Sequence, residues 1–156
     1  MRSEARANAL VLTGSGALLG GALAFQYLGH LAPCEMCLWQ RWPHVAALVF
    51  GLAAWALRNN RAVVALAALA MLVTAGIGYF HAGVEYHWWA GPQACTAPAI
   101  GAGSDFITAA LATPMIRCDA AAWTLFGVSM AGYNALISTL IGGGALWLLR
   151  KPHTKP

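Results

Sequence analysis

The sequence predicts an all-α membrane protein that folds as a four-transmembrane-helix bundle. The chain is 60% hydrophobic and only 9% charged, whereas a soluble domain carries about 25% charged residues. A helix that crosses a bilayer needs roughly 20 mostly apolar residues. Residues 7–25, 62–80 and 120–149 are uncharged stretches of that kind. The whole chain, 1–156, is short enough to predict a single integral membrane domain.

Four helices are expected, at roughly 7–27, 38–57, 62–80 and 123–149. The second is the least regular, because its apolar part is short and a full span must take in polar residues near its start, among them Arg41. An arginine at membrane depth is costly and indicates a functional site by default. Snorkelling of its side chain to the headgroups accounts for it equally well.

Basic residues orient the expected helices. Seven of the nine lie in segments at one face: Arg2, Arg6, Arg58, Arg61, Arg150, Lys151 and Lys155. The positive-inside rule therefore places both termini in the cytoplasm. The outer loops are then roughly 28–37 and 81–122, and the second is expected to carry a short interfacial helix near Ser104. The chain has no block of basic residues interleaved with aromatic ones, so nucleic acid is not expected as a partner.

The cysteines Cys34, Cys37, Cys95 and Cys118 all fall on the outer side of this arrangement, where disulfides persist. A C-x-x-C pair closes a small, strained and therefore reducible disulfide. Cys37 lies at the expected start of the second helix, where the helix dipole favours an anion. Arg41 follows one turn later on the same face. The pattern predicts a redox-active pair with a thiolate at Cys37.

A redox pair needs an electron acceptor, and the sequence narrows the choice. It contains no Gly-rich dinucleotide fingerprint, haem motif or iron–sulfur spacing. The acceptor that remains is a lipid-soluble carrier beside the second helix. Arg41 is suited to hydrogen-bond a quinone carbonyl and to stabilise the negative charge that develops there.

Alternative functions remain open from the residues alone. The main alternative is a membrane protein that binds or transports a soft metal ion through its thiols. A structural zinc site is disfavoured because Cys95 and Cys118 are widely separated instead of forming a second C-x-x-C pair. Two inert structural disulfides are a third possibility, and these would resist a mild reductant.

Several motifs together resemble the DsbB disulfide bond formation family over nearly the whole chain. They are Gln26-Tyr27, Pro33 to Cys37 with Gln40-Arg41, Tyr79 to Glu85, Gly91-Pro92 with Cys95, and Cys118 with Trp123 to Asn134. The match extends to their order and spacing.

The resemblance implies a thiol:quinone oxidoreductase of the bacterial inner membrane. Such an enzyme reoxidises a periplasmic thioredoxin-fold, DsbA-like dithiol oxidase and passes two electrons to ubiquinone or menaquinone. Cys37 would carry the thiolate that meets the quinone, and Arg41 and His81 would bind the quinone. Taken alone, His81 is typical of an ordinary interfacial histidine.

The resemblance also assigns the other cysteines. Cys95 would exchange with the partner's active-site thiol, and Cys118 would be its disulfide partner. Cys34 and Cys118 would join transiently as electrons pass between the two loops. Glu85, one turn after His81, either orients that histidine or is simply solvated.

Overall fold

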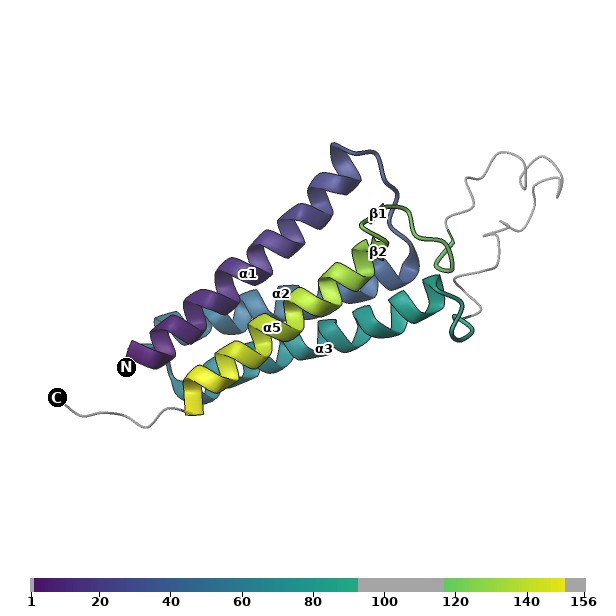
Figure 1. Ribbon diagram of the computed structural model, residues 1–156. Coiled ribbons are helices and arrows are strands. Elements are labelled where there is room, and N and C mark those ends of the chain that lie inside the picture. The colour runs from purple at the N-terminus through teal and green to yellow at the C-terminus, as the bar shows by residue number, and fades with distance from the viewer. Residues whose placement is uncertain (1, 93–116, 151–156) are drawn as a thin grey trace, which may run out of the picture.

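The computed structural model describes residues 2–92 and 117–150. Over these residues the chain forms four long helices and one short two-stranded ribbon (Figure 1). In chain order they are α1 (Arg2–Tyr27), α2 (Glu35–Ala56), α3 (Arg61–Glu85), β1 (Thr124–Leu125), β2 (Val128–Ser129) and α5 (Met130–Arg150). The all-α fold class is confirmed. Cys95 and the interfacial helix expected near Ser104 lie outside the described residues.

The helices form an elongated bundle in which neighbours pack side by side (Figure 1). α3 packs most extensively against α5 and α2, and α1 packs against α2 and α5. Going around the bundle, the order is therefore α1, α2, α3, α5, with α2 and α5 diagonally opposite each other. The start of α1 and the end of α5 lie at one end of the bundle, and β1 and β2 lie at the other (Figure 1).

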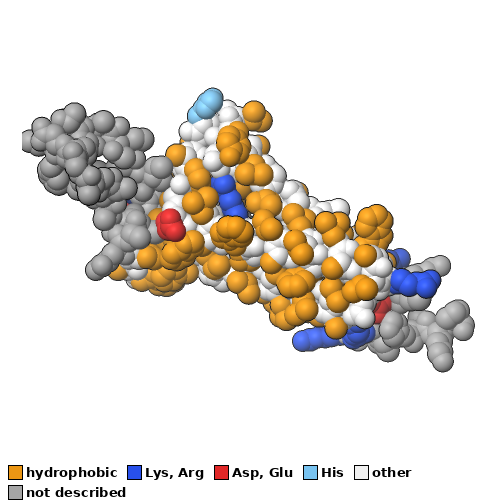
Figure 2. All heavy atoms as spheres, turned by 180° about the vertical axis from the view of Figure 1, so that it is seen from behind, with side chains coloured by type: hydrophobic (Ala, Val, Ile, Leu, Met, Phe, Trp, Pro, Cys, Tyr) orange, Lys and Arg blue, Asp and Glu red, His pale blue; other side chains and the backbone are white. Residues whose placement is uncertain are grey.

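Small side chains fill the core of the bundle and large apolar side chains cover its outside. The buried residues include Ala47, Ala54, Ala67, Ala68, Ala131, Ala135 and Ala145. The exposed ones include Val49, Leu52, Trp55, Leu66, Leu69, Val73, Leu140 and Trp147. Figure 2 shows hydrophobic side chains along the length of one face. Most of the basic side chains coloured there lie at one end, and another lies towards the opposite end. Small residues between helices and large apolar ones outside are typical of membrane helices.

Three helices in the described part of the chain are long and apolar enough to cross a membrane, namely Ser3–Tyr27, Arg61–Glu85 and Met130–Arg150. α2 is absent from this group. Its first half carries the polar residues that made the second expected span irregular, including Gln40, Arg41 and His44.

Three helices extend beyond the ranges expected from the sequence. α1 begins at Arg2, before the expected 7, and the changes in α2 and α3 move functional residues into helices. α2 begins at Glu35, three residues before the expected 38, because the Cys34 sulfur caps it by accepting a hydrogen bond from the Cys37 amide. α3 continues to Glu85, well past the expected end at 80. His81 and Glu85 therefore project from a rigid helix and not from a loop.

The last helix begins later than expected, at Met130 and not at 123. Residues 124–129 instead form an antiparallel ribbon in which Thr124 pairs with Ser129 and Leu125 with Val128. Gly127 supplies a positive φ of 77° at the turn. The Tyr86 hydroxyl, just after α3, fixes the ribbon by donating to the Gly127 carbonyl at 2.8 Å and accepting from the Ser129 amide at 3.1 Å.

Close contact between α3 and α5 depends on glycine. A Cβ atom at Gly78 would lie 3.1 Å from the Ala131 carbonyl oxygen and 3.1 Å from the Ala135 backbone nitrogen. One at Gly142 would lie 2.8 Å from the Leu72 side chain. The two backbones approach each other only because these side chains are missing.

Candidate functional site

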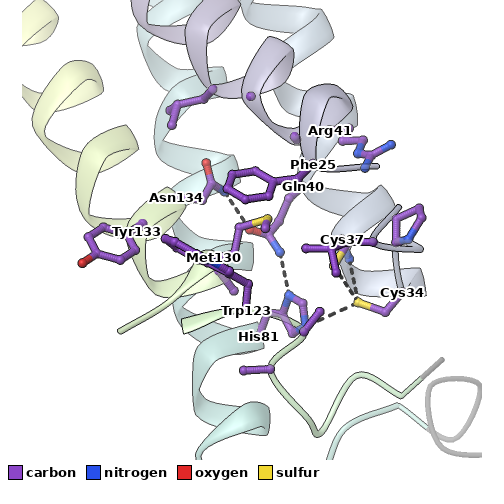
Figure 3. Close-up of a pocket in the computed structure, with 18 of the residues that line it drawn as sticks. Phe25, Cys34, Cys37, Gln40, Arg41, His81, Trp123, Met130, Tyr133 and Asn134 are labelled. Atoms are coloured by element: carbon purple, nitrogen blue, oxygen red, sulfur yellow. Dashed lines mark hydrogen bonds between the residues drawn. The ribbon is translucent and has the colours of Figure 1, made fainter. Parts of the chain in front are cut away.

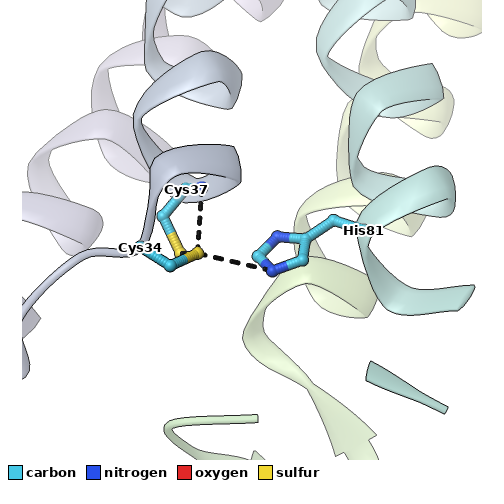
Figure 4. Close-up of side chains that lie close together, drawn as sticks. All are labelled: Cys34, Cys37 and His81. Atoms are coloured by element: carbon cyan, nitrogen blue, oxygen red, sulfur yellow. Dashed lines mark hydrogen bonds between the residues drawn. The ribbon is translucent and has the colours of Figure 1, made fainter. Parts of the chain in front are cut away.

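Cys34 and Cys37 lie at the start of α2, with their sulfurs 2.8 Å apart and both thiols free. The Cys34 thiol donates to the Cys37 sulfur and accepts from the Cys37 amide at 3.2 Å (Figure 4). The hydrogen bond to Cys37, followed by burial, raises the pKa of the Cys34 thiol above its usual value. This favours the protonated form of Cys34, and a thiolate at Cys37 stays a prediction.

His81 approaches the pair from α3. Its Nε2 lies 3.5 Å from the Cys34 sulfur (Figure 4), and the residue is only 2% exposed. Glu85, one helical turn further on, places Oε1 3.7 Å from the same nitrogen. Its Oε2 is buried without a hydrogen-bond partner. Glu85 thus faces His81 at the site.

Cys118 lies in the same cluster although it is far away in the sequence. It is fully buried, disulfide-bonded, and packs with Cys34, Cys37 and Val84. A backbone hydrogen bond also links it to His81. The structure therefore brings together three of the four predicted redox cysteines and the predicted histidine. The fourth, Cys95, lies outside the described residues.

Two charged residues flank Cys118, the exposed Arg117 and the half-buried Asp119. Arg117 donates to the Asp119 carboxylate through Nε at 2.8 Å and Nη2 at 2.6 Å. These hydrogen bonds hold the pKa of Asp119 below its usual value. The pair bridges the backbone on both sides of the buried cysteine.

Arg41 is held between α1 and α2. Its Nη1 donates to the Gln26 side-chain oxygen at 2.5 Å. Its Nε is buried and has no hydrogen-bond partner. A buried guanidinium donor without an acceptor is costly, because the lost solvation is not replaced. An acceptor supplied by a ligand would satisfy this nitrogen.

A cavity of about 600 Å³ opens beside Arg41. Most of its walls are apolar and come from α1, α2, α5 and the segment that leads into β1 (Figure 3). Phe25, Trp123 and Tyr133 form an aromatic wall, with ring centroids 5.3 Å apart for the first two and 6.1 Å apart for the last two. Cys37 and Arg41 both line the cavity. It is thus a mainly apolar site with a few convergent polar groups, as ligand sites commonly are.

The described structure adds polar residues to which the sequence analysis gave no role. Gln40 Nε2 lies 2.7 Å from His81 Nδ1, and Asn134 Nδ2 donates to Gln40 Oε1 at 2.7 Å (Figure 3). His44 Nε2 lies 2.9 Å from Asn134 Oδ1. Polar side chains within apolar helices were the available signal, since such groups are usually hydrogen-bonded between helices. Which of these side chains meet across the helices could not be predicted from the sequence.

The cysteine pair also offers ligands for a metal. One donor atom each from Cys34, Cys37 and His81 lies within 4.8 Å of the others. Thiolate and imidazole are ligands that soft and borderline metals prefer. This cluster gives the soft-metal alternative a structural basis.

Comparison with known proteins places the chain in a family. A model for "Disulfide bond formation protein DsbB" matches residues 4–148. The chain is 30% identical to Disulfide bond formation protein B of Polaromonas naphthalenivorans (strain CJ2), over 92% of this chain and 89% of the relative. It is 34% identical to the protein of that name from Verminephrobacter eiseniae (strain EF01-2), over 96% and 88%. No solved structure matches the chain.

The family match spans nearly the whole chain, including all the described helices and the site that they form. It agrees with the motifs around the two cysteine pairs, and the apolar helices agree with a membrane protein. The chain therefore belongs to the DsbB family of disulfide bond formation proteins.

Proposed function

We propose that this chain is a thiol:quinone oxidoreductase that generates disulfide bonds. It reoxidises a periplasmic thioredoxin-fold, DsbA-like dithiol oxidase and passes the two electrons to ubiquinone or menaquinone. Cys34, Cys37, Cys95 and Cys118 are the catalytic residues. The family membership and the names of the relatives support disulfide formation.

One observation carries the assignment of a quinone. Arg41, whose Nε is unpartnered, and Cys37 border the same apolar cavity. A guanidinium N–H is suited to a carbonyl oxygen, and the aromatic wall is suited to a flat ring. A bound quinone would supply an acceptor for two electrons and two protons. Arg41 would hold its carbonyl, with Cys37 and His81 beside it.

The cysteines would move electrons by thiol–disulfide exchange. A partner thiolate attacks the Cys95–Cys118 disulfide at Cys95, and Cys118 leaves as a thiolate. The partner's second thiol then attacks the partner sulfur of the mixed disulfide. This step closes the partner disulfide and releases Cys95 as a thiolate. Cys118 attacks Cys34 of the Cys34–Cys37 disulfide, and Cys37 leaves as a thiolate. Cys95 finally attacks Cys118, which restores that disulfide and leaves Cys34 and Cys37 reduced. The packing of Cys118 against Cys34 supports the exchange between the pairs.

We further propose that all four described helices span the bacterial inner membrane. α2 has 22 residues and is therefore about 33 Å long at 1.5 Å per residue, which matches a hydrocarbon core of about 30 Å. The polar first half of α2 faces partners inside the bundle, including His81 and Asn134. Both termini would be cytoplasmic, and the cysteines would face the periplasm.

The decisive experiment follows quinone absorbance. Purified protein in detergent receives ubiquinone or menaquinone and a reduced DsbA-like dithiol oxidase. We expect catalytic quinone reduction by the wild type, none by Cys37→Ser, and at least about a tenfold lower rate for Arg41→Ala, because a charge-assisted hydrogen bond is worth about 1.5–3 kcal/mol. Arg58→Ala is the matched control, since Arg58 lies in the turn after α2 at the opposite end of that helix. Absence of reduction with both quinones, in folded protein, would contradict the proposal.

The soft-metal alternative makes the opposite prediction. The cluster of Cys34, Cys37 and His81 would bind Zn²⁺ or Cu⁺ tightly in the reduced protein. No reaction would then depend on quinone. Stoichiometric metal retention after gel filtration, together with failure of the quinone assay, would favour that function.

A further inference from the structure

A chain of hydrogen bonds runs through the interior of the bundle and ends at the cysteine pair (Figure 3). It connects α2 to α5, which lie diagonally opposite, then returns to α2 and crosses to α3. Its members in order are His44, Asn134, Gln40, His81, Cys34 and Cys37. A side-chain amide can be flipped and a neutral imidazole has two tautomers, so the effect of the chain depends on which atom donates at each contact.

Thr74 fixes the direction at Asn134. The Thr74 hydroxyl donates its only proton to the Gln40 backbone carbonyl at 2.9 Å. It can therefore only accept from Asn134, whose Nδ2 lies 3.1 Å away. The Asn134 oxygen then faces His44, and the His44 proton must sit on Nε2 to donate to it.

Met36 fixes the direction at Gln40. The Gln40 Nε2 donates to the Met36 backbone carbonyl at 3.3 Å, and a carbonyl can only accept. The same nitrogen faces His81 Nδ1 at 2.7 Å, so Nδ1 is the acceptor. A neutral imidazole has one proton, which leaves it on Nε2. That nitrogen faces the Cys34 sulfur and Glu85 Oε1, both of which can accept. The Cys118 backbone also accepts from the ring, which agrees with a proton on Nε2.

We propose that Gln40 and Asn134 are positioning residues that lock His81 as the Nε2–H tautomer. All the donors in the chain then point the same way, from His44 towards the cysteine pair. His81 donates to Cys34, and Cys34 in turn donates to Cys37. Hydrogen bonds aligned in this manner polarise one another, so the chain stabilises negative charge on the Cys37 sulfur. In this arrangement His81 is a hydrogen-bond donor and not the base that deprotonates Cys34.

The effect of the fixed His81 tautomer on electron transfer rests on the proposed function. The tautomer itself can be measured without any turnover. The full-length reduced protein, labelled with ¹⁵N-histidine, is placed in lipid nanodiscs at a pH of about 8, where histidine is neutral. Long-range ¹H–¹⁵N spectra distinguish a protonated Nδ1 from a protonated Nε2. Loss of signals in His81→Asn assigns the ring among the five histidines of the chain.

We expect His81 to be the Nε2–H tautomer in the wild type. Gln40→Glu replaces the donor with a carboxylate that only accepts, so the proton should move to Nδ1. Gln40→Leu should give a mixture of tautomers. Asn8→Leu is the matched control, because Asn8 is also a buried amide that bridges helices but lies at the other end of the bundle. It should leave His81 unchanged.

A second readout follows the charge on Cys37. Gln40→Leu should slow alkylation of Cys37 about fivefold at neutral pH, since only the thiolate reacts, whereas Asn8→Leu should not. An Nδ1–H tautomer in the wild type would overturn the proposal even if every variant failed to fold. Unchanged tautomer and alkylation rate in folded Gln40→Leu would overturn it as well. Either result could be obtained in a protein that still reduces quinone, so the tautomer is tested separately from the proposed function.

Discussion

Cys34 and Cys37 have opposite chemical environments although only two residues separate them. Both line the cavity beside Arg41. Cys34 is buried and donates its proton to Cys37, which raises the pKa of Cys34, whereas Cys37 is half-buried and accepts that hydrogen bond. A thiol whose pKa is raised remains protonated and unreactive at neutral pH. We therefore expect iodoacetamide to modify Cys37 at least about tenfold faster than Cys34 in the reduced protein, since one pKa unit corresponds to tenfold. Peptide mass mapping over time measures both rates.

The Cys37→Ala variant provides the control. It removes the hydrogen-bond acceptor that contributes most to the raised pKa of Cys34. Alkylation of Cys34 should then become faster than in the wild type. Equal rates for the two cysteines in the wild type would contradict this assignment of charge.

Asp119 provides a prediction about pH. Because Arg117 lowers the pKa of Asp119, the ion pair stabilises the folded protein above the usual carboxyl pKa. This stabilisation is lost as the pH falls through the lowered pKa. We expect Asp119→Asn to have a slightly lower unfolding temperature than the wild type at neutral pH, and the two to converge in acid. The difference should be small because the pair lies at the surface, where solvent screens it; Arg117 is exposed and Asp119 is half-buried. A difference that stays constant with pH would exclude the ion pair as its cause.

At this scale, the sequence predicted several of the residues that the structure brings together. Cys37, Arg41 and His81 lie together as expected, because the C-x-x-C spacing and one helical turn fix where Cys37 and Arg41 point. The roles of Gln40 and Asn134 were not predictable. Their contact joins residues on different helices, so it depends on the packing of α2 across from α5 and not on any local spacing.

At the scale of elements, the contact between α3 and α5 depends on Gly78. A larger residue would press directly on the α5 backbone at Ala131 and Ala135. We expect Gly78→Leu to lower the free energy of unfolding by about 1–3 kcal/mol, as overpacked cores do. Gly76→Leu is the matched control on the same helix, because a Cβ there meets no atom within 4 Å. SDS titration in mixed micelles, monitored by far-UV circular dichroism, measures both, and equal effects would contradict the close approach.

The three uncharged stretches each predicted a long helix of the described structure, because length and composition alone decide whether a segment is apolar throughout. The fourth helix, α2, had to be extended through polar residues to be predicted. Their ends were harder to predict. α5 starts only at Met130, since the preceding residues pair as a ribbon fixed by Tyr86, which is distant in the sequence. The continuation of α3 to Glu85 was missed because the apolar character stops before the helix does.

At the scale of the whole molecule, the distribution of basic residues predicts its orientation in the membrane. In a variant without native cysteines, a cysteine at His30 should react with a membrane-impermeant maleimide in intact spheroplasts. One at Asn59, in the turn between α2 and α3 at the opposite end of α2, should react only after permeabilisation. The reverse pattern would invert the proposed topology. Labelling of both without permeabilisation would argue against a span through α2.

The apolar cavity beside Arg41 has a consequence for how the proposed turnover rate depends on the amount of quinone. A ligand that reaches it from the bilayer is dissolved in lipid, so its effective concentration is a ratio of quinone to lipid molecules. Adding empty lipid to a fixed amount of protein and quinone should therefore slow turnover, although no concentration in the water has changed. In a cell, the rate of disulfide formation would then follow the composition of the membrane as well as the amount of enzyme within it.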